Sequence, residues 1–285
     1  MKYLKIFFFV LIAHIYSSTY AVSPGEVRFG NESADTVTIT NILQEIHDAH
    51  YKTTNEKIIA IARKLIDTPY GAGTLECSPE QLTVNLSAVD CTTFVEYVTA
   101  MAMTIDENRT SWHDFIYNLE RLRYRNGQIN GYSSRLHYVS DWIIDNAHRG
   151  ILQDVTDRIA IPSYQIKTLD FMSRNRDKYP ALAEDEEFEK LKNAEIGYRS
   201  HRIPYIKPTN TAKLPLNDGD IIIIISKTQG LDAQHMGFAI NIDGQPHLLH
   251  ASSAHGKVLI DPLSISEYLK RNRSASGIRV VRLKE

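Results

Sequence analysis

The sequence predicts an α+β fold in which helices come first and an antiparallel sheet follows. Two early segments, 38–50 and 55–66, carry apolar residues at helical spacing. Much later, Ile221 to Ile225 is a continuous β-branched run, and Asp243-Gly244 separates two further apolar segments, which is a strong hairpin signal. A chain whose helices and strands are segregated in this way builds an α+β domain.

The first 21 residues have the order of a secretory signal peptide. Lys2 and Lys5 precede an apolar run from Ile6 to Ile15, and small polar residues lead to Ala21. The run is too short to span a bilayer comfortably. We therefore expect cleavage after Ala21 and a periplasmic or secreted protein without a membrane anchor, folded as a single domain over residues 22–285.

The composition is that of an ordinary globular protein. The chain has 285 residues, 43% of them hydrophobic, with a formal net charge of -2. It contains no long basic run, so we do not expect nucleic acid as a partner.

The remaining elements are placed by their apolar patterns and turn signals. An extended lead-in is expected over 22–35, and a helix start at Asn55. Residues 159–210 are predicted to be a solvated helical insertion, with polar helices around 165–175 and 183–198, because this part of the chain is rich in charge. Helices are expected at 92–103, 112–123, 139–148 and 264–271, and strands at 221–225, 236–242, 245–251, 258–260 and 278–283.

Cys91 is the first candidate catalytic residue. It follows Asp90, where a loop becomes an apolar helix. A thiol in the first turn lies among unpaired N–H groups and the positive end of the helix dipole, where it ionises more easily and becomes a nucleophile. The alternative is structural: Cys77 is the only other cysteine, and in an oxidising compartment the two would pair as a disulfide.

The predicted hairpin supplies candidates for a base. A two-residue turn at Asp243-Gly244 places Ile242 opposite Gln245 and, counting back along both strands, His250 opposite Gly237. His235 is two residues from Gly237, on the same sheet face, so His235 and His250 become diagonal neighbours. His247 falls opposite Ile240 and points to the other side. Gly237 is expected to leave room for a substrate.

Other chemistries have less support in the sequence. His235 and His250 could ligate zinc with a carboxylate or another histidine, but there is no His-Glu-x-x-His and no tight cluster with metal-ligand spacing. A Gly-x-Ser-x-Gly serine nucleophile and a phosphate-binding loop are also absent. We therefore expect no metal and no cofactor.

The order of these motifs resembles the NlpC-type cell-wall cysteine peptidases, which have a papain-like fold. The shared features are Thr68-Pro69-Tyr70, Asp90-Cys91, Asp218-Gly219-Asp220, His235-Met236-Gly237 and His250-Ala251-Ser252. A related branch is more similar still: the N-acetylmuramoyl-L-alanine amidase-like family, also known as domain of unknown function 1460. Its marks here are Val-Asp-Cys-Thr-Thr-Phe-Val-Glu and Gly-Tyr-Ser-Ser-Arg-Leu-His-Tyr-x-x-Asp-Trp. The resemblance extends over about 58–282.

The resemblance implies a mechanism of acyl transfer. Cys91 would be the nucleophile, His235 the base and His250 the residue that orients the base, while Tyr70 would help to polarise the carbonyl. The helical insertion departs from the short NlpC-type domain. Side chains that we expect to form a substrate wall for an acidic glycopeptide are Arg125, Arg135, His137, Tyr138 and Asp141. The alternative for all five is a structural network between helices, and for Asp141, as for Trp142, the two interpretations are equal.

The expected function is an exported cysteine amidohydrolase acting on peptidoglycan or its fragments. The preferred bond joins N-acetylmuramic acid to L-alanine. One alternative is cleavage between D-glutamate and diaminopimelate by the same machinery. The other is a non-catalytic cell-wall-binding protein, in which Cys91 is consumed by a disulfide with Cys77.

Overall fold

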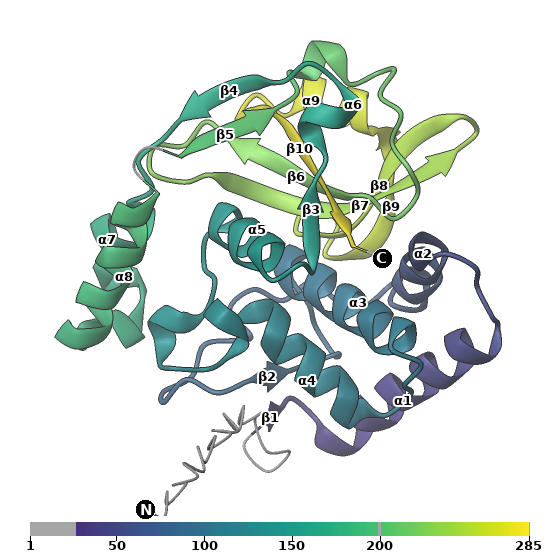
Figure 1. Ribbon diagram of the computed structural model, residues 1–285, viewed down its shortest axis with the longest axis horizontal. Helices are drawn as coiled ribbons and strands as arrows, with labels where there is room; N and C mark the ends of the chain where they lie inside the picture. The colour runs from purple at the N-terminus through teal and green to yellow at the C-terminus, as the bar shows by residue number, and fades with distance from the viewer. Residues whose placement is uncertain (1–26, 199–200, 285) are drawn as a thin grey trace, which may run out of the picture.

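The computed structural model describes residues 27–198 and 201–284 (Figure 1). A six-stranded sheet lies against a layer of helices, with α9 and α6 on the opposite face of the sheet and α7 and α8 at one side. The predicted signal peptide lies outside the described residues. Among the helices that are described, none is long and apolar enough to cross a bilayer.

The helical layer contains the elements expected from periodicity, with corrected beginnings. Its members are α1 Glu32–Asp48, α2 Thr54–Lys64, α3 Cys91–Asp106, α4 Trp112–Arg123 and α5 Val139–His148. The expected extended lead-in is wrong over its last residues, because Asn31 caps α1 by accepting the Ala34 N–H at 3.2 Å. The expected start of α2 at Asn55 is also wrong: Thr53 caps it, in a reciprocal capping box with Glu56.

Helix α3 is the centre of the helical layer. From Thr93 to Ile105 every side chain is buried, so the helix is apolar all round and is packed on all sides. Phe94 meets the sheet at Phe238, with ring centroids 5.7 Å apart. Cys91, the first residue of α3, is thereby held against the sheet.

The sheet is antiparallel throughout, in the order β3-β10-β6-β7-β8-β9. Ile221, Ile223 and Ile225 pack into the core that contains the helical layer, whereas Ile222 and Ile224 pack into a second core with α9. This explains the unbroken isoleucine run, since both faces of its strand are covered. The elements are β3 Leu152–Asp154, β6 Ile221–Ser226, β7 Ala233–Ile242, β8 Gln245–Ser252, β9 Lys257–Ser264, β10 Ala275–Leu283 and α9 Ile265–Arg271.

The predicted hairpin register is confirmed. Ile242 pairs with Gln245, Ile240 with His247 and Phe238 with Leu249. Gly237 and His250 follow the Phe238–Leu249 pair and still lie close together, because a Cβ on Gly237 would be 2.7 Å from His250 Cβ. The two histidines of interest lie at this end of the hairpin. Strand β3, which was not predicted, adds to the sheet beside β10.

The prediction of a purely helical, solvated insertion is wrong. The segment expected to be a helix at 165–175 is instead divided between β4 Ser163–Ile166 and the short α7 Phe171–Arg174. Strand β4 pairs with β5 Arg202–Tyr205, a partner too distant in sequence for local periodicity to reveal. Only the second expected helix is present, as α8 Asp185–Gly197.

The insertion also has a small core of its own. Leu169, Met172, Leu182 and Leu191 are buried together with Tyr132 and Tyr138 from the main body. Because most residues of α8 are charged, the sequence pattern did not reveal the side of the helix that contributes Leu191 to this core. The shorter elements of the chain are β1 Arg28–Phe29, β2 Thr83–Val84, α6 Thr156–Ile159, η2 Arg125–Gly127, η3 Tyr132–Ser134, η4 Arg176–Lys178, η5 Pro180–Ala183 and η6 Pro208–Asn210.

Candidate active site

Cys91 begins α3, as predicted, and Asp90 caps the helix. The Asp90 carboxylate accepts the Thr93 N–H at 2.8 Å, while the Thr93 hydroxyl accepts the Asp90 N–H at 2.9 Å. The Cys91 side chain is partly buried, and its sulfur receives hydrogen bonds from the Met236 main chain and the Thr92 side chain. Because Met236 follows His235 in β7, the thiol lies beside the strand that carries the candidate base.

The expectation that Cys91 ionises easily is corrected by its surroundings. Burial raises the pKa of the Cys91 thiol to about 11, with a further contribution from the Asp90 charge, and the hydrogen bonds from Met236 and Thr92 offset only part of this. Burial of the sulfur is the main physical reason, and the helix cap adds to it. The Asp90 carboxylate occupies a first-turn N–H and places a negative charge beside the sulfur, which opposes the helix dipole.

His235 and His250 meet as the register predicted. His235 Nε2 lies 2.5 Å from His250 Nδ1, and the two rings are nearly perpendicular. Burial, with a smaller contribution from the neighbouring His250, lowers the pKa of His235 to about 3. At neutral pH His235 is therefore an uncharged imidazole, which is the form that can accept a proton.

Gly237 has a different role from the one expected. A Cβ at this position would lie 2.7 Å from His250 Cβ and 2.9 Å from the Leu249 carbonyl oxygen. The missing side chain therefore makes room for the His250 ring to pack beside β7, rather than for a substrate.

Two residues near the histidines were missed by sequence reasoning. Asp261 of β9 places Oδ2 3.3 Å from His250 Nε2. Tyr268 of α9 lies with its ring centroid 6.4 Å from that of His235 and 6.0 Å from that of His250. The register of β8 and β9 could have revealed Asp261, because His250 pairs with Leu259 and Asp261 lies two residues further along β9. Tyr268 had no signal in the sequence, since only the packing of α9 brings it here.

Tyr70 lies near the residues that lead into α3. It forms a parallel bridge with Val89, which precedes Asp90 and Cys91. Burial raises the pKa of the Tyr70 hydroxyl, and the nearby Cys91 and Asp90 raise it further. Tyr70 and Tyr268 both interact electrostatically with Cys91, so each lies close to the sulfur.

A polar cleft opens at the two histidines. It has a volume of about 280 Å³. Its lining is formed by Gln234, His235, His250, Ser252, Ser253, Ala254, His255, Asp261, Tyr268, Asn272 and Ser274. The cleft thus presents hydroxyl, amide and imidazole groups to a ligand beside the candidate base.

Arg125 and Asp141, two members of the expected substrate wall, pair with one another. Arg125 forms two parallel hydrogen bonds to the Asp141 carboxylate, at 2.9 and 2.5 Å. The Tyr198 hydroxyl, at the end of α8, also donates to Asp141. Asp141 is almost fully buried, whereas the Arg125 side chain remains 31% exposed. For Asp141 this is the structural network that the sequence left as an alternative.

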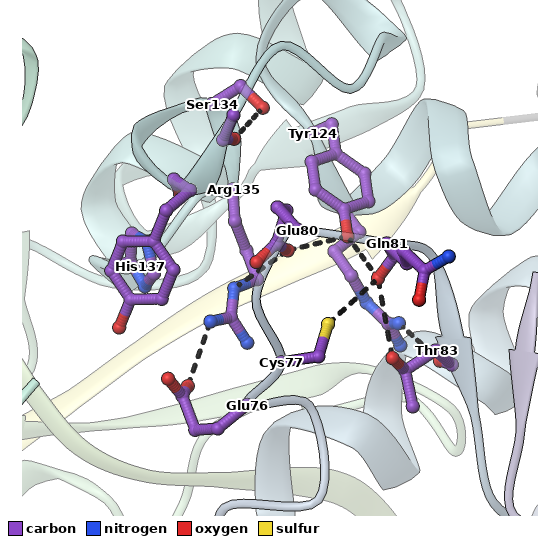
Figure 2. A network of polar contacts seen from close by, with 12 residues as sticks. Glu76, Cys77, Glu80, Gln81, Thr83, Tyr124, Ser134, Arg135 and His137 are labelled. Atoms are coloured by element: carbon purple, nitrogen blue, oxygen red, sulfur yellow. Dashed lines mark hydrogen bonds and ion pairs between the residues drawn. The ribbon is translucent and has the colours of Figure 1, made fainter. Parts of the chain in front are cut away.

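Arg135 lies in a buried polar network with the loop before α3 (Figure 2). Its guanidinium lies 2.8 Å from Glu76 Oε1 and 3.3 Å from Glu80 Oε1. Glu80 also accepts the Tyr124 hydroxyl at 2.8 Å. Burial raises the pKa of Glu80, against the lowering effect of Arg135. The Arg135 side chain is 7% exposed, so it ties the loop to the body of the protein.

His137 and Tyr138 connect the same segment to its surroundings. His137 Nε2 lies 2.9 Å from the Tyr132 carbonyl oxygen, and burial together with Arg135 lowers the pKa of His137 to about 3. The Tyr138 hydroxyl donates to Glu195 Oε1 at 2.7 Å and accepts the Met172 N–H at 2.9 Å. Tyr138 therefore joins the insertion to the main body.

Both cysteines are free thiols in this structure. Cys77 Sγ lies 4.0 Å from the Gln81 carbonyl oxygen, within the network of Figure 2. The disulfide alternative is therefore not the state described here. Within residues 27–198 and 201–284, no group of three or more His, Cys, Asp or Glu side chains has the geometry to hold a metal ion.

Sequence comparison identifies the family to which these features belong. The profile of the N-acetylmuramoyl-L-alanine amidase-like family matches residues 60–278. The chain belongs to this family. Membership supports a cell-wall amidase-like function. A comparison with curated protein sequences gave no match.

Solved structures support the assignment. An N-acetylmuramoyl-L-alanine amidase from Bacteroides uniformis ATCC 8492 is 39% identical, with a TM-score of 0.78, and the match covers 81% of this chain and 99% of that one. A Bacteroides fragilis protein, named as a candidate xylanase, is 42% identical, with a TM-score of 0.74 and coverage of 78% and 99%. A Legionella pneumophila protein of domain of unknown function 1460 is 24% identical, with a TM-score of 0.68 and coverage of 90% and 97%, and shows the fold alone.

Proposed function

We propose that this member of the amidase-like family is an exported cysteine amidohydrolase that cuts an amide bond in peptidoglycan or its fragments. The preferred bond is that between N-acetylmuramic acid and L-alanine. Cys91 is the nucleophile, His235 the base and His250 the residue that orients it. One observation carries the proposal: His235 Nε2 lies 2.5 Å from His250 Nδ1, and the Cys91 sulfur is hydrogen-bonded to the main chain of the next residue, Met236.

The resting site holds a neutral pair rather than an ion pair. The pKa of Cys91 is raised to about 11 and that of His235 is lowered to about 3, so neither is charged near neutral pH. His235 therefore takes the thiol proton as sulfur attacks the amide carbonyl. The tetrahedral intermediate expels the amine with that proton and leaves a thioester. His235 then deprotonates a water, which attacks the thioester, and the proton returns to Cys91.

The surroundings of Cys91 suit this chemistry. The main-chain N–H of Cys91, at the start of α3, is close to the Cys91 sulfur. It can therefore donate a hydrogen bond to the oxyanion that develops when the sulfur attacks the carbonyl. Tyr70 flanks the sulfur and would polarise the carbonyl. The polar lining of the 280 Å³ cleft is compatible with a hydrated sugar or peptide.

The expected substrate wall divides into two kinds of residue under this proposal. Arg125 keeps 31% of its side chain exposed while it is paired, so it is the member best placed to meet an acidic glycopeptide. His137 is partly buried, and Arg135, Tyr138 and Asp141 are almost fully buried. These four would act by holding the segment 125–141 in shape.

The fold and the location of the protein are part of the same proposal. A cysteine at a helix start, packed against an antiparallel sheet that carries the histidines, is the arrangement of the papain-like NlpC-type enzymes that the sequence resembles. The charged, apolar and small-residue order of residues 1–21 supports export. Mass spectrometry of the protein recovered from cells would test export, with Val22 as the expected first residue.

Digestion of purified muropeptides, followed by mass spectrometry, tests the reaction. Free stem peptides that begin with L-alanine would establish the amidase. Products that retain L-alanyl-D-glutamate on the sugar would identify the endopeptidase instead, and new reducing sugar ends would identify a glycosidase. Cys91→Ala should abolish turnover, whereas Cys77→Ala, which removes the other thiol, should retain it. Binding without turnover in the parent protein would favour the non-catalytic alternative.

A further inference from the structure

Asp261 continues the line of polar side chains that begins at His235. His250 pairs with Leu259 across β8 and β9, and Asp261 lies two residues beyond Leu259 on the same face. Its Oδ2 is 3.3 Å from His250 Nε2, and the side chains of His250 and Asp261 are only 1% and 4% exposed. Asp261 thus faces a buried nitrogen for which the described residues supply no hydrogen bond of standard geometry.

The positions of the protons follow from this contact. A carboxylate can only accept hydrogen bonds, so the His250 nitrogen facing Asp261 must carry the hydrogen. The other nitrogen, Nδ1, then has a lone pair and accepts from His235 Nε2, 2.5 Å away. His235 is consequently protonated on Nε2 and has its lone pair on Nδ1. Nδ1 is the ring nitrogen nearer the main chain. The Cys91 sulfur is hydrogen-bonded to the same stretch of main chain, at Met236.

The opposite arrangement would disable the base. A His250 protonated on Nδ1 would turn a lone pair toward a buried carboxylate, which is repulsive. It would also donate to His235 Nε2 and leave the only hydrogen of a neutral His235 on Nδ1. In that state His235 has no lone pair available for the Cys91 proton.

We propose that Asp261 is a positioning residue that acts through His250 to hold His235 in the tautomer whose Nδ1 accepts the Cys91 proton. The inference rests on the proposed function of Cys91 and His235.

Asp261 is itself firmly held in its orientation. The Leu263 N–H donates to Asp261 Oδ1 at 2.8 Å, and His247 Nδ1 lies 2.9 Å from the Asp261 main-chain oxygen. Burial would raise the pKa of Asp261, but the hydrogen bonds from His250 and Leu263 outweigh it and lower the pKa. The carboxylate is thus ionised at neutral pH, and its charge would also stabilise the imidazolium that forms when His235 takes the proton.

The substitution Asp261→Asn tests the proposal sharply. The Leu263 N–H needs an acceptor, so the asparagine oxygen takes the Oδ1 position and its NH₂ group faces His250 Nε2. A donor at that point requires a lone pair on Nε2 and moves the His250 hydrogen to Nδ1. The shape of the site is kept and the tautomers of both histidines are reversed.

The decisive measurement is long-range proton–nitrogen NMR of isotope-labelled protein, in the full chain carrying Cys91→Ala. Both His235 and His250 should be protonated on Nε2, and adding Asp261→Asn should move the hydrogen of His250 to Nδ1. Asp220→Asn is the matched control, because Asp220, the residue before β6, is also fully buried but pairs with Arg282; it should leave both tautomers unchanged. Unchanged tautomers in Asp261→Asn, or a doubly protonated His250 in the parent, would overturn the proposal.

Kinetics provide the second readout. In the active protein, Asp261→Asn should lower kcat by about 100-fold or more with little change in KM, because binding is intact and the base is lost. Asp220→Asn should retain kcat. The NMR result does not depend on Cys91, so activity that survives Cys91→Ala would contradict the proposed function and leave the tautomer result standing. Unaltered kcat in Asp261→Asn would contradict the positioning role alone.

Discussion

His235 Nε2 and His250 Nδ1 lie 2.5 Å apart, on the neighbouring strands β7 and β8. The contact leaves only one nitrogen of His235 free to receive a proton. It also makes the orientation of the His235 ring depend on a buried neighbour. Substitutions of His250 should therefore lower the rate of the reaction without changing the binding of the substrate.

His250→Ala should reduce kcat more than it affects KM. The substitution removes the partner of His235 Nε2, so the ring loses both its orientation and its fixed tautomer, and we expect kcat to fall by about 100- to 1000-fold. Steady-state kinetics on a muropeptide substrate would measure this. His113→Ala is the control, since His113 is exposed in the first turn of α4, where it contacts the Ser111 hydroxyl. Equal losses in the two variants would contradict an orienting role for His250.

Gly237→Ala should damage the site through packing alone. The added Cβ would lie 2.7 Å from His250 Cβ, so the His250 ring or β8 has to shift. We expect a loss of stability of about 1–3 kcal/mol, together with a lower kcat.

Gly244→Ala is the matched control for that experiment. Gly244 lies in the turn of the same hairpin, with a φ of +79° and no atom within 4 Å of an added Cβ. Left-handed strain should lower the stability by about 1 kcal/mol, with no change in kcat. Urea unfolding and kinetics on both variants would separate the effects. Full activity in Gly237→Ala would show that His250 tolerates displacement.

The Cys91 thiol should stay protonated at neutral pH. Burial and Asp90 raise its pKa to about 11, so thiolate absorbance should be absent near neutrality and grow only at strongly alkaline pH. The measurement is a pH titration of the ultraviolet thiolate band in a Cys77→Ala background, where Cys91 is the only thiol. A thiolate that titrates below about pH 7 would show a resting ion pair with His235 instead.

Acid should destabilise the protein through histidines that the fold keeps neutral. Folding lowers the pKa of His137 to about 3, whereas in the unfolded chain it is about 6.5. Between these values only the unfolded chain binds the proton, so stability is lost as pH falls through that window. His235 acts in the same direction.

The variant His137→Gln isolates one of these contributions. Glutamine can still donate to the Tyr132 carbonyl but cannot take up a proton. The dependence of unfolding free energy on pH should become shallower by up to about 1.4 kcal/mol per pH unit. Urea titrations at several values between about pH 4 and pH 7 would show it. Parallel curves for the two proteins would mean that His137 is protonated in the fold.

Arg135→Met should lower the stability of the fold, because it leaves the buried Glu80 carboxyl without its ion-pair partner. Glu80, with a side chain 1% exposed, would lose its ion pair at 3.3 Å, and we expect a loss of about 3–5 kcal/mol. The double variant Arg135→Met with Glu80→Met should recover much of that loss, since it leaves neither member of this buried pair without its partner.

Glu76→Gln is the comparison for this pair. Glu76 also pairs with Arg135, but 43% of its side chain is exposed, so its removal should cost less than about 1 kcal/mol. Thermal unfolding of the variants would rank them. A double variant as unstable as Arg135→Met alone would mean that packing, and not the unpaired charge, sets the cost.

Local signals were sufficient for much of this protein. The helix start at Cys91 follows from Asp90 and Thr93, which cap each other within four residues. The contact between His235 and His250 follows from the Asp243-Gly244 turn, because a two-residue turn sets the register of both strands. The helices at 112–123 and 139–148 were located by their apolar periodicity.

Features that depend on distant partners could not be predicted in this way. Residues 163–166 form a strand because the distant segment β5 pairs with them. Tyr268 lies near the histidines because α9 packs on the face of the sheet opposite to the helical layer. The pKa of Cys91 also came out opposite to expectation. Sequence locates a thiol at a helix start, but burial and the nearby Asp90 charge decide its ionisation, and burial exists only once distant segments have packed around the sulfur.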